Sequence, residues 1–232
     1  LGCALFVRSR SSLPSGLVEI THERVALRGS RRLCAPGPAF RFGFVRSRPS
    51  LVSRSPMSRQ LTVIVLAAGR GTRTRVSIPK VLLPVCGRNV VGCVLDEVAC
   101  LQPQRTVVVV HHEADRVRAS LAGRPELTFV DQGDPRGTGH AGQVAMAAVG
   151  DAALGEDGGD VLIVNGDGCL ITHETLSALV EYRGDGAGSI LTSVPPDASG
   201  MGRIVRGVGG ELLAIREERD CTEDEREIDE IN

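Results

Sequence analysis

The feature that most constrains this chain is a buried strand that runs directly into a glycine-rich turn. Residues 61–68 (LTVIVLAA) are apolar apart from Thr62, a pattern typical of a strand buried on both faces of a parallel sheet. Gly69 and Gly71 come next, and glycines allow the backbone to turn tightly and bring its N–H groups up to a bound anion. Side chains suited to phosphate oxygens follow shortly after: Thr72, Arg73 and Lys80. The stretch therefore predicts a site for a nucleoside triphosphate.

Two better-known phosphate-binding loops are excluded by their spacing. A dinucleotide-binding fingerprint needs a third glycine where this chain has Thr74, and an acidic residue for a ribose, but the second predicted strand ends in Val110 and His111. A Walker A loop needs Gly-x-x-x-x-Gly-Lys followed by Ser or Thr, and the sequence contains no such run. Lys80 is the single lysine among 27 basic residues, which suggests that its position requires a compact ammonium, with chance as the alternative.

Charge divides the chain into two parts. Residues 1–57 contain ten arginines and two acidic residues, so residues 58–232 are strongly acidic although the whole chain has a net charge of −1. We expect residues 1–57 to be a basic, disordered or non-native N-terminal extension and residues 58–232 to form the folded domain. The extension could be a nucleic-acid-binding arm, a transit peptide or sequence upstream of the true start, and the third is favoured because Met57 directly precedes the first predicted strand.

Cysteine usage and hydropathy bear on the compartment. The seven cysteines form no Cys-x-x-Cys pair and no His/Cys ligand spacing, which favours a reducing, cytoplasmic compartment and argues against a zinc site. Because no apolar run approaches about 18 residues, we expect no membrane span.

Strand-forming and helix-forming segments alternate after the glycine-rich turn. The expected helices are 90–101, 114–121, 139–149 and 172–182, and the expected strands are 106–110, 127–130, 161–165, a strand after the turn at 200–202, and 212–217. This alternation is typical of βαβ units, and it predicts an α/β fold, a Rossmann-like three-layer α/β/α sandwich with a mostly parallel mixed sheet. Ligands of such sheets bind at the carboxyl ends of the strands.

Polar residues follow several of these strands. Gln132 lies in a glycine-rich turn that leads into a helix, and its amide has the donor and the acceptor needed to match the imide edge of a uracil; a plain turn is the alternative. Asp167 follows a strand and Gly166, where a carboxylate suits magnesium shared with phosphates, with a helix or turn cap as the equal alternative. Glu217 closes the last strand, whereas the acidic run after it is typical of a solvated face and contains a capping-box pattern at 222–225.

Together these motifs resemble the bacterial N-acetylglucosamine-1-phosphate uridylyltransferases. The matching segments are LAAGRGTRT, IPKVLLP, VDQGDPRGTGHA, NGDGCLI, GMGRIV, IREERD and EIN, in this order between Leu61 and Asn232. The resemblance implies a fold of the nucleotide-diphospho-sugar transferase type and a C-terminally incomplete nucleotidyltransferase domain at 58–232. It also implies transfer of UMP from UTP to N-acetylglucosamine 1-phosphate, which gives UDP-N-acetylglucosamine and pyrophosphate with Mg²⁺ as cofactor.

The resemblance further implies roles for individual residues. Arg73 and Lys80 would be catalytic residues at the triphosphate, and Asp167 would bind Mg²⁺. The nucleotide would be held by Leu66, Ala67, Ala68, Gly69, Gly71, Thr72, Gln132, Gly137 and Thr138. The sugar phosphate would be held by Gly202, Glu217 and Asn232. Four residues differ from those usual in the family and bear on sugar preference: Asn165, Gly168, Cys169 and Met201.

The resemblance places a second magnesium ligand beyond Asn232, so we expect the chain to be a fragment. It leaves open a homo-oligomer in a full-length parent, and no nucleic acid partner is expected. Two alternatives to the implied function stay open. One is a nucleotidyltransferase for another hexose 1-phosphate, and the other is a non-catalytic nucleotide-binding remnant.

Overall fold

The computed structural model describes residues 4–8, 40–45, 60–69, 78–134, 136–150, 159–183 and 188–232, the first two ranges as backbone only. The chain divides into two compact units. The first consists of Leu1–Ser11 with Arg54–Val180, and the second consists of Ser12–Ser53 with Glu181–Asn232.

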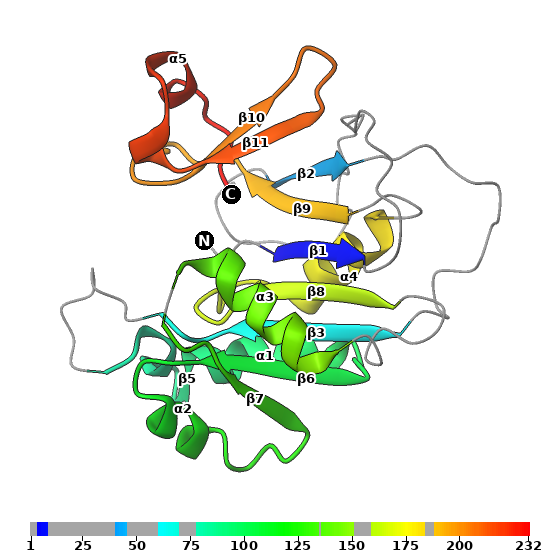
Figure 1. Cartoon of the computed structure of the whole chain (residues 1–232), viewed down its shortest axis with the longest axis vertical. Coiled ribbons are helices and arrows are strands. Elements are labelled where there is room, and N and C mark those ends of the chain that lie inside the picture. The colour runs from blue at the N-terminus through cyan, green and yellow to red at the C-terminus, as the bar shows by residue number, and fades with distance from the viewer. Residues whose placement is uncertain are drawn as a thin grey trace. The chain divides into compact units, whose positions relative to one another are not determined.

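The first unit is built on a mixed sheet. Its strands lie side by side in the order β1 (Ala4–Arg8), β8 (Asp160–Asn165), β3 (Leu61–Leu66), β6 (Arg105–Val110) and β7 (Leu127–Asp131) (Figure 1). β3 pairs in parallel with both β8 and β6, and β6 pairs in parallel with β7, whereas β1 runs antiparallel to β8. The predicted, mostly parallel mixed sheet is therefore confirmed.

Helices cover both faces of this sheet. They are α1 (Val90–Cys100), α2 (Ala114–Ser120), α3 (Thr138–Val149) and α4 (His173–Tyr182). Figure 1 shows α3 in front of the sheet and α1 and α4 behind it. Val63, Ile64 and Val65 are completely buried although successive side chains of a strand point to opposite faces, so both faces of β3 are covered. Ala141 and Ala145 of α3 belong to the same apolar cluster as Ile64, which confirms the three-layer α/β/α sandwich.

α1 shows how local sequence sets one of these helices. Asn89 caps its first turn, since its Oδ1 accepts a hydrogen bond from the Gly92 N–H at 2.6 Å. The sequence predicts an apolar face of Val91, Val94, Leu95, Val98 and Leu101. The first four are buried, whereas Leu101 is half-buried at the end of the helix. Gln102, at a φ of 51°, and Pro103 follow the helix and end it. Between β3 and α1 lie three short elements that the sequence analysis did not predict: η2 (Lys80–Leu82), β4 (Pro84–Val85) and β5 (Arg88–Asn89).

The second unit consists of short antiparallel pairings. β2 (Phe40–Val45) pairs with β9 (Gly188–Ser193), and β10 (Arg203–Arg206) pairs with β11 (Leu212–Arg216). Ile231 forms antiparallel bridges to both Ser193 and Arg203 and thereby joins the two pairs. η4 (Glu218–Asp220) and α5 (Glu223–Arg226) follow β11, and the predicted capping box at Thr222 and Glu225 is confirmed.

β1 and β2 lie within the segment expected to be a disordered or non-native extension. Their backbones form strands, and β1 pairs with β8 along all five of its residues. The other residues of 1–57 lie outside the described part of the chain. The expectation that this segment is an extension separate from the domain stays a prediction.

Candidate functional site

The segments expected to bind nucleotide meet at one edge of the sheet in the first unit. β8, β3, β6 and β7 run in parallel, so their carboxyl ends lie along the same edge. Backbone hydrogen bonds continue past the strand ends: Gly166 N donates to Leu66 O at 2.9 Å, Ala67 N to Val109 O at 2.8 Å, and Gln132 N to Val110 O at 2.8 Å. The structure thus brings the Leu66–Gly69 segment next to the segment that carries Asp167, and it places Gln132 at the same edge of the sheet, on the far side of β6.

Gly166 is required for this arrangement. A Cβ atom at this position would lie 2.8 Å from the carbonyl oxygen of Leu66, which is a backbone atom that has no room to move aside. The missing side chain lets the segment after β8 approach the end of β3. Asp167 therefore follows directly at the point where the glycine-rich turn begins.

Asp167 forms an ion pair with Lys80 at this edge. Lys80 Nζ donates to Asp167 Oδ2 at 2.7 Å, and the two side chains are 46% and 33% exposed. An ion pair with this much solvent contact contributes about 0.2–1 kcal/mol, so it opens readily when another ligand competes. The two residues expected at the triphosphate and at the metal are thus in direct contact.

The glycine-rich turn is described only at its start. Ala67 and Ala68 are buried and Gly69 is exposed, so a ligand reaches this segment through its backbone. Residues 70–77 lie outside the described part of the chain. The roles expected for Gly71, Thr72 and Arg73 therefore stay predictions.

Gln132 has a fixed amide orientation. Its side chain is buried, and its Nε2 donates to the carbonyl oxygen of Gly137 at 3.0 Å. A carbonyl accepts only from the nitrogen of the amide, so this contact assigns Nε2 to the side that faces Gly137. His140 Nδ1 lies 3.5 Å from the same Nε2. In the structure the nitrogen of this amide holds the turn at Gly137. The expectation that Gln132 offers a donor and an acceptor to a base stays a prediction.

The start of α3 is shaped by Gly137. Its φ of 95° lies in the region that favours glycine, and its carbonyl accepts the first intrahelical hydrogen bond, from Ala141 N at 3.2 Å. Thr138 is the first residue of α3, whose opening N–H groups have no partner within the helix and attract anionic or carbonyl oxygens. Gly137 and Thr138 thus lie at the turn that Gln132 holds, and their expected role at the nucleotide stays a prediction.

Asp131 stabilises the same turn, a role that the sequence analysis did not predict. The Gly133 N–H donates to Asp131 Oδ1 at 2.9 Å, and this hydrogen bond lowers the pKa of the carboxyl below its usual range. His111 Nδ1, 3.4 Å from the same oxygen, lowers the pKa further. His111 follows β6 and Asp131 ends β7, so only the pairing of these strands reveals the contact.

The residues expected to bind the sugar phosphate come together in the second unit. Asn232 N donates to Gly202 O at 3.3 Å. Gly202 also lies close to β11, because a Cβ atom added at Gly202 would be 3.4 Å from the carbonyl oxygen of Arg216. Glu217 follows Arg216 directly, and its side chain is exposed. Gly202 thus contacts Asn232 and lies beside the residue that precedes Glu217, and the role of all three at the sugar phosphate stays a prediction.

The oxygen donors at Asp167 fit one mode of magnesium binding. Mg²⁺ is usually held by one or two carboxylates and completes its shell with phosphate oxygens and water. In the described part of the chain, no three His, Cys, Asp or Glu side chains are grouped as a metal site. Asp167 offers a single, partly exposed carboxylate, which fits an ion that arrives with a nucleotide.

Among the described helices, none is long and apolar enough to cross a membrane.

Comparisons with known proteins agree with the motifs. Residues 63–226 match the family model of the MobA-like NTP transferase domain. The bifunctional protein GlmU of Thermosynechococcus vestitus is 43% identical over 172 residues, which are 73% of this chain and 37% of that protein. GlmU of Brevibacillus brevis is 45% identical over 175 residues, which are 75% of this chain and 36% of that protein. The chain thus spans little more than a third of the length of these relatives.

One solved structure shows the fold. The crystal structure of HddC from Yersinia pseudotuberculosis, complexed with GMP-PN, aligns with a TM-score of 0.50 over 67% of this chain and 68% of its own length. The sequences are 20% identical, so this likeness concerns the fold alone.

Proposed function

Because the chain belongs to the family of MobA-like NTP transferase domains, we propose that it is a sugar-1-phosphate nucleotidyltransferase that transfers UMP from UTP to N-acetylglucosamine 1-phosphate. The observation that carries the proposal is the edge of the first unit where Asp167 and Gln132 follow parallel strands and Lys80 pairs with Asp167. The similarity to GlmU proteins supports the same choice.

Gln132 supports uracil as the base. With Nε2 held by Gly137 O, Oε1 is the amide atom that would accept a hydrogen bond from a base. Uracil carries a donor, N3–H, at the position where cytosine carries an acceptor nitrogen. A fixed acceptor pairs with the N3–H of uracil and repels the acceptor nitrogen of cytosine. A polar group left unpaired in a binding site costs about 1–3 kcal/mol of binding free energy. Gln132 therefore selects UTP over CTP.

Lys80 and Asp167 support a ligand that carries a triphosphate beside its base. The Lys80 ammonium can leave Asp167 for a phosphate oxygen, where it neutralises charge, and Arg73 is assigned to the same task. Asp167 would hold Mg²⁺, which when bound draws negative charge from the phosphate oxygens. The N–H groups of the Leu66–Gly69 segment and of the first turn of α3 would bind the uridine and phosphate oxygens.

The reaction is a direct transfer. An oxygen of the sugar phosphate attacks the α-phosphorus of UTP, the bond from that phosphorus to the bridging oxygen breaks, and pyrophosphate leaves with the electron pair. No covalent bond to the protein is needed, since the side chains hold the reactants in line and neutralise charge. Gly202, Glu217 and Asn232 are assigned to the sugar phosphate.

Calorimetric titration with a nucleotide panel tests this function. In the presence of Mg²⁺, the chain should bind UTP about tenfold or more tightly than CTP, and should show no measurable preference for ATP or GTP over CTP. Equal affinity for UTP and CTP, or no binding of UTP, would contradict the proposal.

A further inference from the structure

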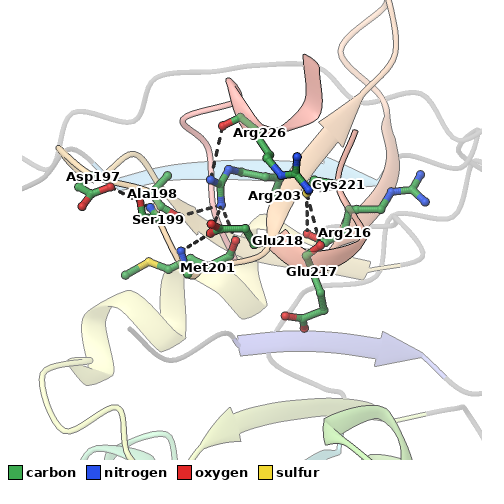
Figure 2. A network of polar contacts seen from close by, with 11 residues as sticks. Asp197, Ala198, Ser199, Met201, Arg203, Arg216, Glu217, Glu218, Cys221 and Arg226 are labelled. Carbon is green, nitrogen blue, oxygen red and sulfur yellow. Dashed lines mark hydrogen bonds and ion pairs between the residues drawn. The ribbon is translucent and has the colours of Figure 1, made fainter. Parts of the chain in front are cut away.

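Arg203 is the centre of a polar network in the second unit (Figure 2). It is the first residue of β10, and its side chain is only 4% exposed. Its Nη1 donates to the carbonyl oxygen of Ala198 at 2.8 Å and to that of Met201, and its Nη2 donates to the carbonyl oxygen of Arg226 at 3.4 Å. One guanidinium therefore joins the turn before β10 to the end of α5.

Glu218 links the network to the segments that carry Gly202 and Glu217. Its Oε2 lies 3.5 Å from Arg203 Nη1 and accepts a hydrogen bond from Gly200 N. Gly200 is two residues before Gly202, and Glu218 directly follows Glu217. Figure 2 shows the Glu217 side chain pointing away from this network, so its carboxylate is not used to hold Arg203.

Stability alone is a weak reason for this buried arginine. Removing a guanidinium from water is costly, and the acceptors closest to Arg203 are neutral carbonyls, whereas the Glu218 carboxylate lies 3.5 Å away. Within the described residues, the Nε of Arg203 is buried and has no hydrogen-bond partner, which adds to that cost. What a planar guanidinium does provide is a fixed geometry between the chain segments that it joins.

We propose that Arg203 is a positioning residue for the sugar phosphate. Its guanidinium holds the turn that carries Gly202 and the segment that carries Glu217 in the one arrangement that receives N-acetylglucosamine 1-phosphate. Arg203 acts through these segments and does not touch the ligand, because its side chain is buried. The inference rests on the proposed function, which assigns Gly202 and Glu217 to the sugar phosphate.

The test measures two affinities on the same variants. Arg203→Lys keeps the positive charge but loses the fork that reaches several carbonyls at once, and Glu218→Gln keeps the shape but loses the charge. Arg219→Lys is the matched control, since Arg219 lies in η4 beside Glu218 and is 84% exposed. Binding of N-acetylglucosamine 1-phosphate is followed by NMR titration and binding of UTP by calorimetry, and thermal unfolding identifies the variants that fold.

Arg203→Lys should weaken binding of the sugar phosphate about tenfold and leave the UTP affinity within about twofold of wild type. Glu218→Gln should shift the same affinity in the same direction, and Arg219→Lys should change neither. Wild-type affinity for the sugar phosphate in folded Arg203→Lys and Glu218→Gln would overturn the inference, as would equal losses for both ligands. If wild type itself bound UTP but no sugar phosphate, the proposed function would fail and the inference with it.

Discussion

Lys80 Nζ lies 2.7 Å from Asp167 Oδ2, so the residue assigned to the triphosphate and the residue assigned to the metal neutralise each other. Under the proposed function, a cation that takes Asp167 Oδ2 would displace the ammonium, and the displaced ammonium would be free to bind phosphate. The ion pair would then couple metal binding to nucleotide binding, because each ligand would take one partner of the pair.

Replacing Lys80 with Met should separate the effect of Lys80 on metal binding at Asp167 from its effect on nucleotide binding. Without its competitor, Asp167 should bind Mn²⁺, as a probe for Mg²⁺, up to about fivefold more tightly in the absence of nucleotide, which is the effect of an exposed ion pair. UTP should bind about ten- to a hundredfold more weakly, because a charged hydrogen bond to phosphate is lost. Electron paramagnetic resonance measures the first and calorimetry the second. Weaker Mn²⁺ binding by the variant would show that Lys80 does not compete for Asp167.

Replacing Gln132 with Ala should narrow base discrimination. The variant loses the acceptor assigned to uracil N3–H, so the difference in binding free energy between UTP and CTP should shrink by about 1–3 kcal/mol. The same change removes the hydrogen bond to Gly137 O, so thermal unfolding must be measured beside it. Unchanged discrimination in a folded variant would remove Gln132 from the base-reading role.

Replacing Gly166 with Ala should destabilise the first unit. The new Cβ would meet the Leu66 carbonyl oxygen at 2.8 Å, and such overpacking lowers the free energy of unfolding by about 1–3 kcal/mol. Gly123→Ala is the matched control, since Gly123 is exposed and a Cβ there has no heavy atom within 4 Å; its effect should stay within about 0.5 kcal/mol. Urea unfolding of both variants checks the difference, and equal stabilities would contradict the close approach of the two strand ends.

The turn held by Asp131 should respond to pH. A carboxyl whose pKa is lowered in the folded state stabilises that state above its ordinary pKa of 3.8, and loses the contribution as the pH falls through the lowered value. Asp131→Asn mimics the protonated form, so its unfolding midpoint should lie below that of wild type at pH 7, and the two should converge below about pH 4. Glu126→Gln, at an exposed position just before β7, is the control. A gap that stays constant as the pH falls would argue against a charged Asp131 in the turn.

Hydrophobic pattern was enough to predict the helices and the parallel strands of the first unit, but not β1, the short elements η2, β4 and β5, or β9 of the second unit. α1 and β3 carry strong apolar periods, and their buried residues lie where those periods place them. β9 (Gly188–Ser193) was missed because its Gly, Ser and Thr residues break the apolar signal, although all six of its residues are buried. Burial of such residues depends on hydrogen bonds between strands, which a sequence does not display.

The candidate site was predicted in its parts but not in its contacts. Strand ends followed by glycine or polar residues indicated Gln132 and Asp167, because parallel strands share an edge. The contact between Lys80 and Asp167 joins residues 87 positions apart, and the orientation of the Gln132 amide depends on one carbonyl oxygen. Arg203 looked like any arginine of the chain, since only the folded structure shows that its side chain is buried.

Transfer of the uridylyl group itself tests the central claim most directly. The chain, in excess over UTP labelled with radioactive phosphorus at the α-position, is incubated with Mg²⁺ and one of three acceptors: N-acetylglucosamine 1-phosphate, glucose 1-phosphate or galactose 1-phosphate. We predict that the label moves into a UDP-sugar with release of one pyrophosphate per transfer, and that N-acetylglucosamine 1-phosphate is the preferred acceptor. Preferred transfer to another hexose 1-phosphate would contradict the assigned substrate, and label that stays in bound UTP with all three acceptors would contradict the assigned reaction.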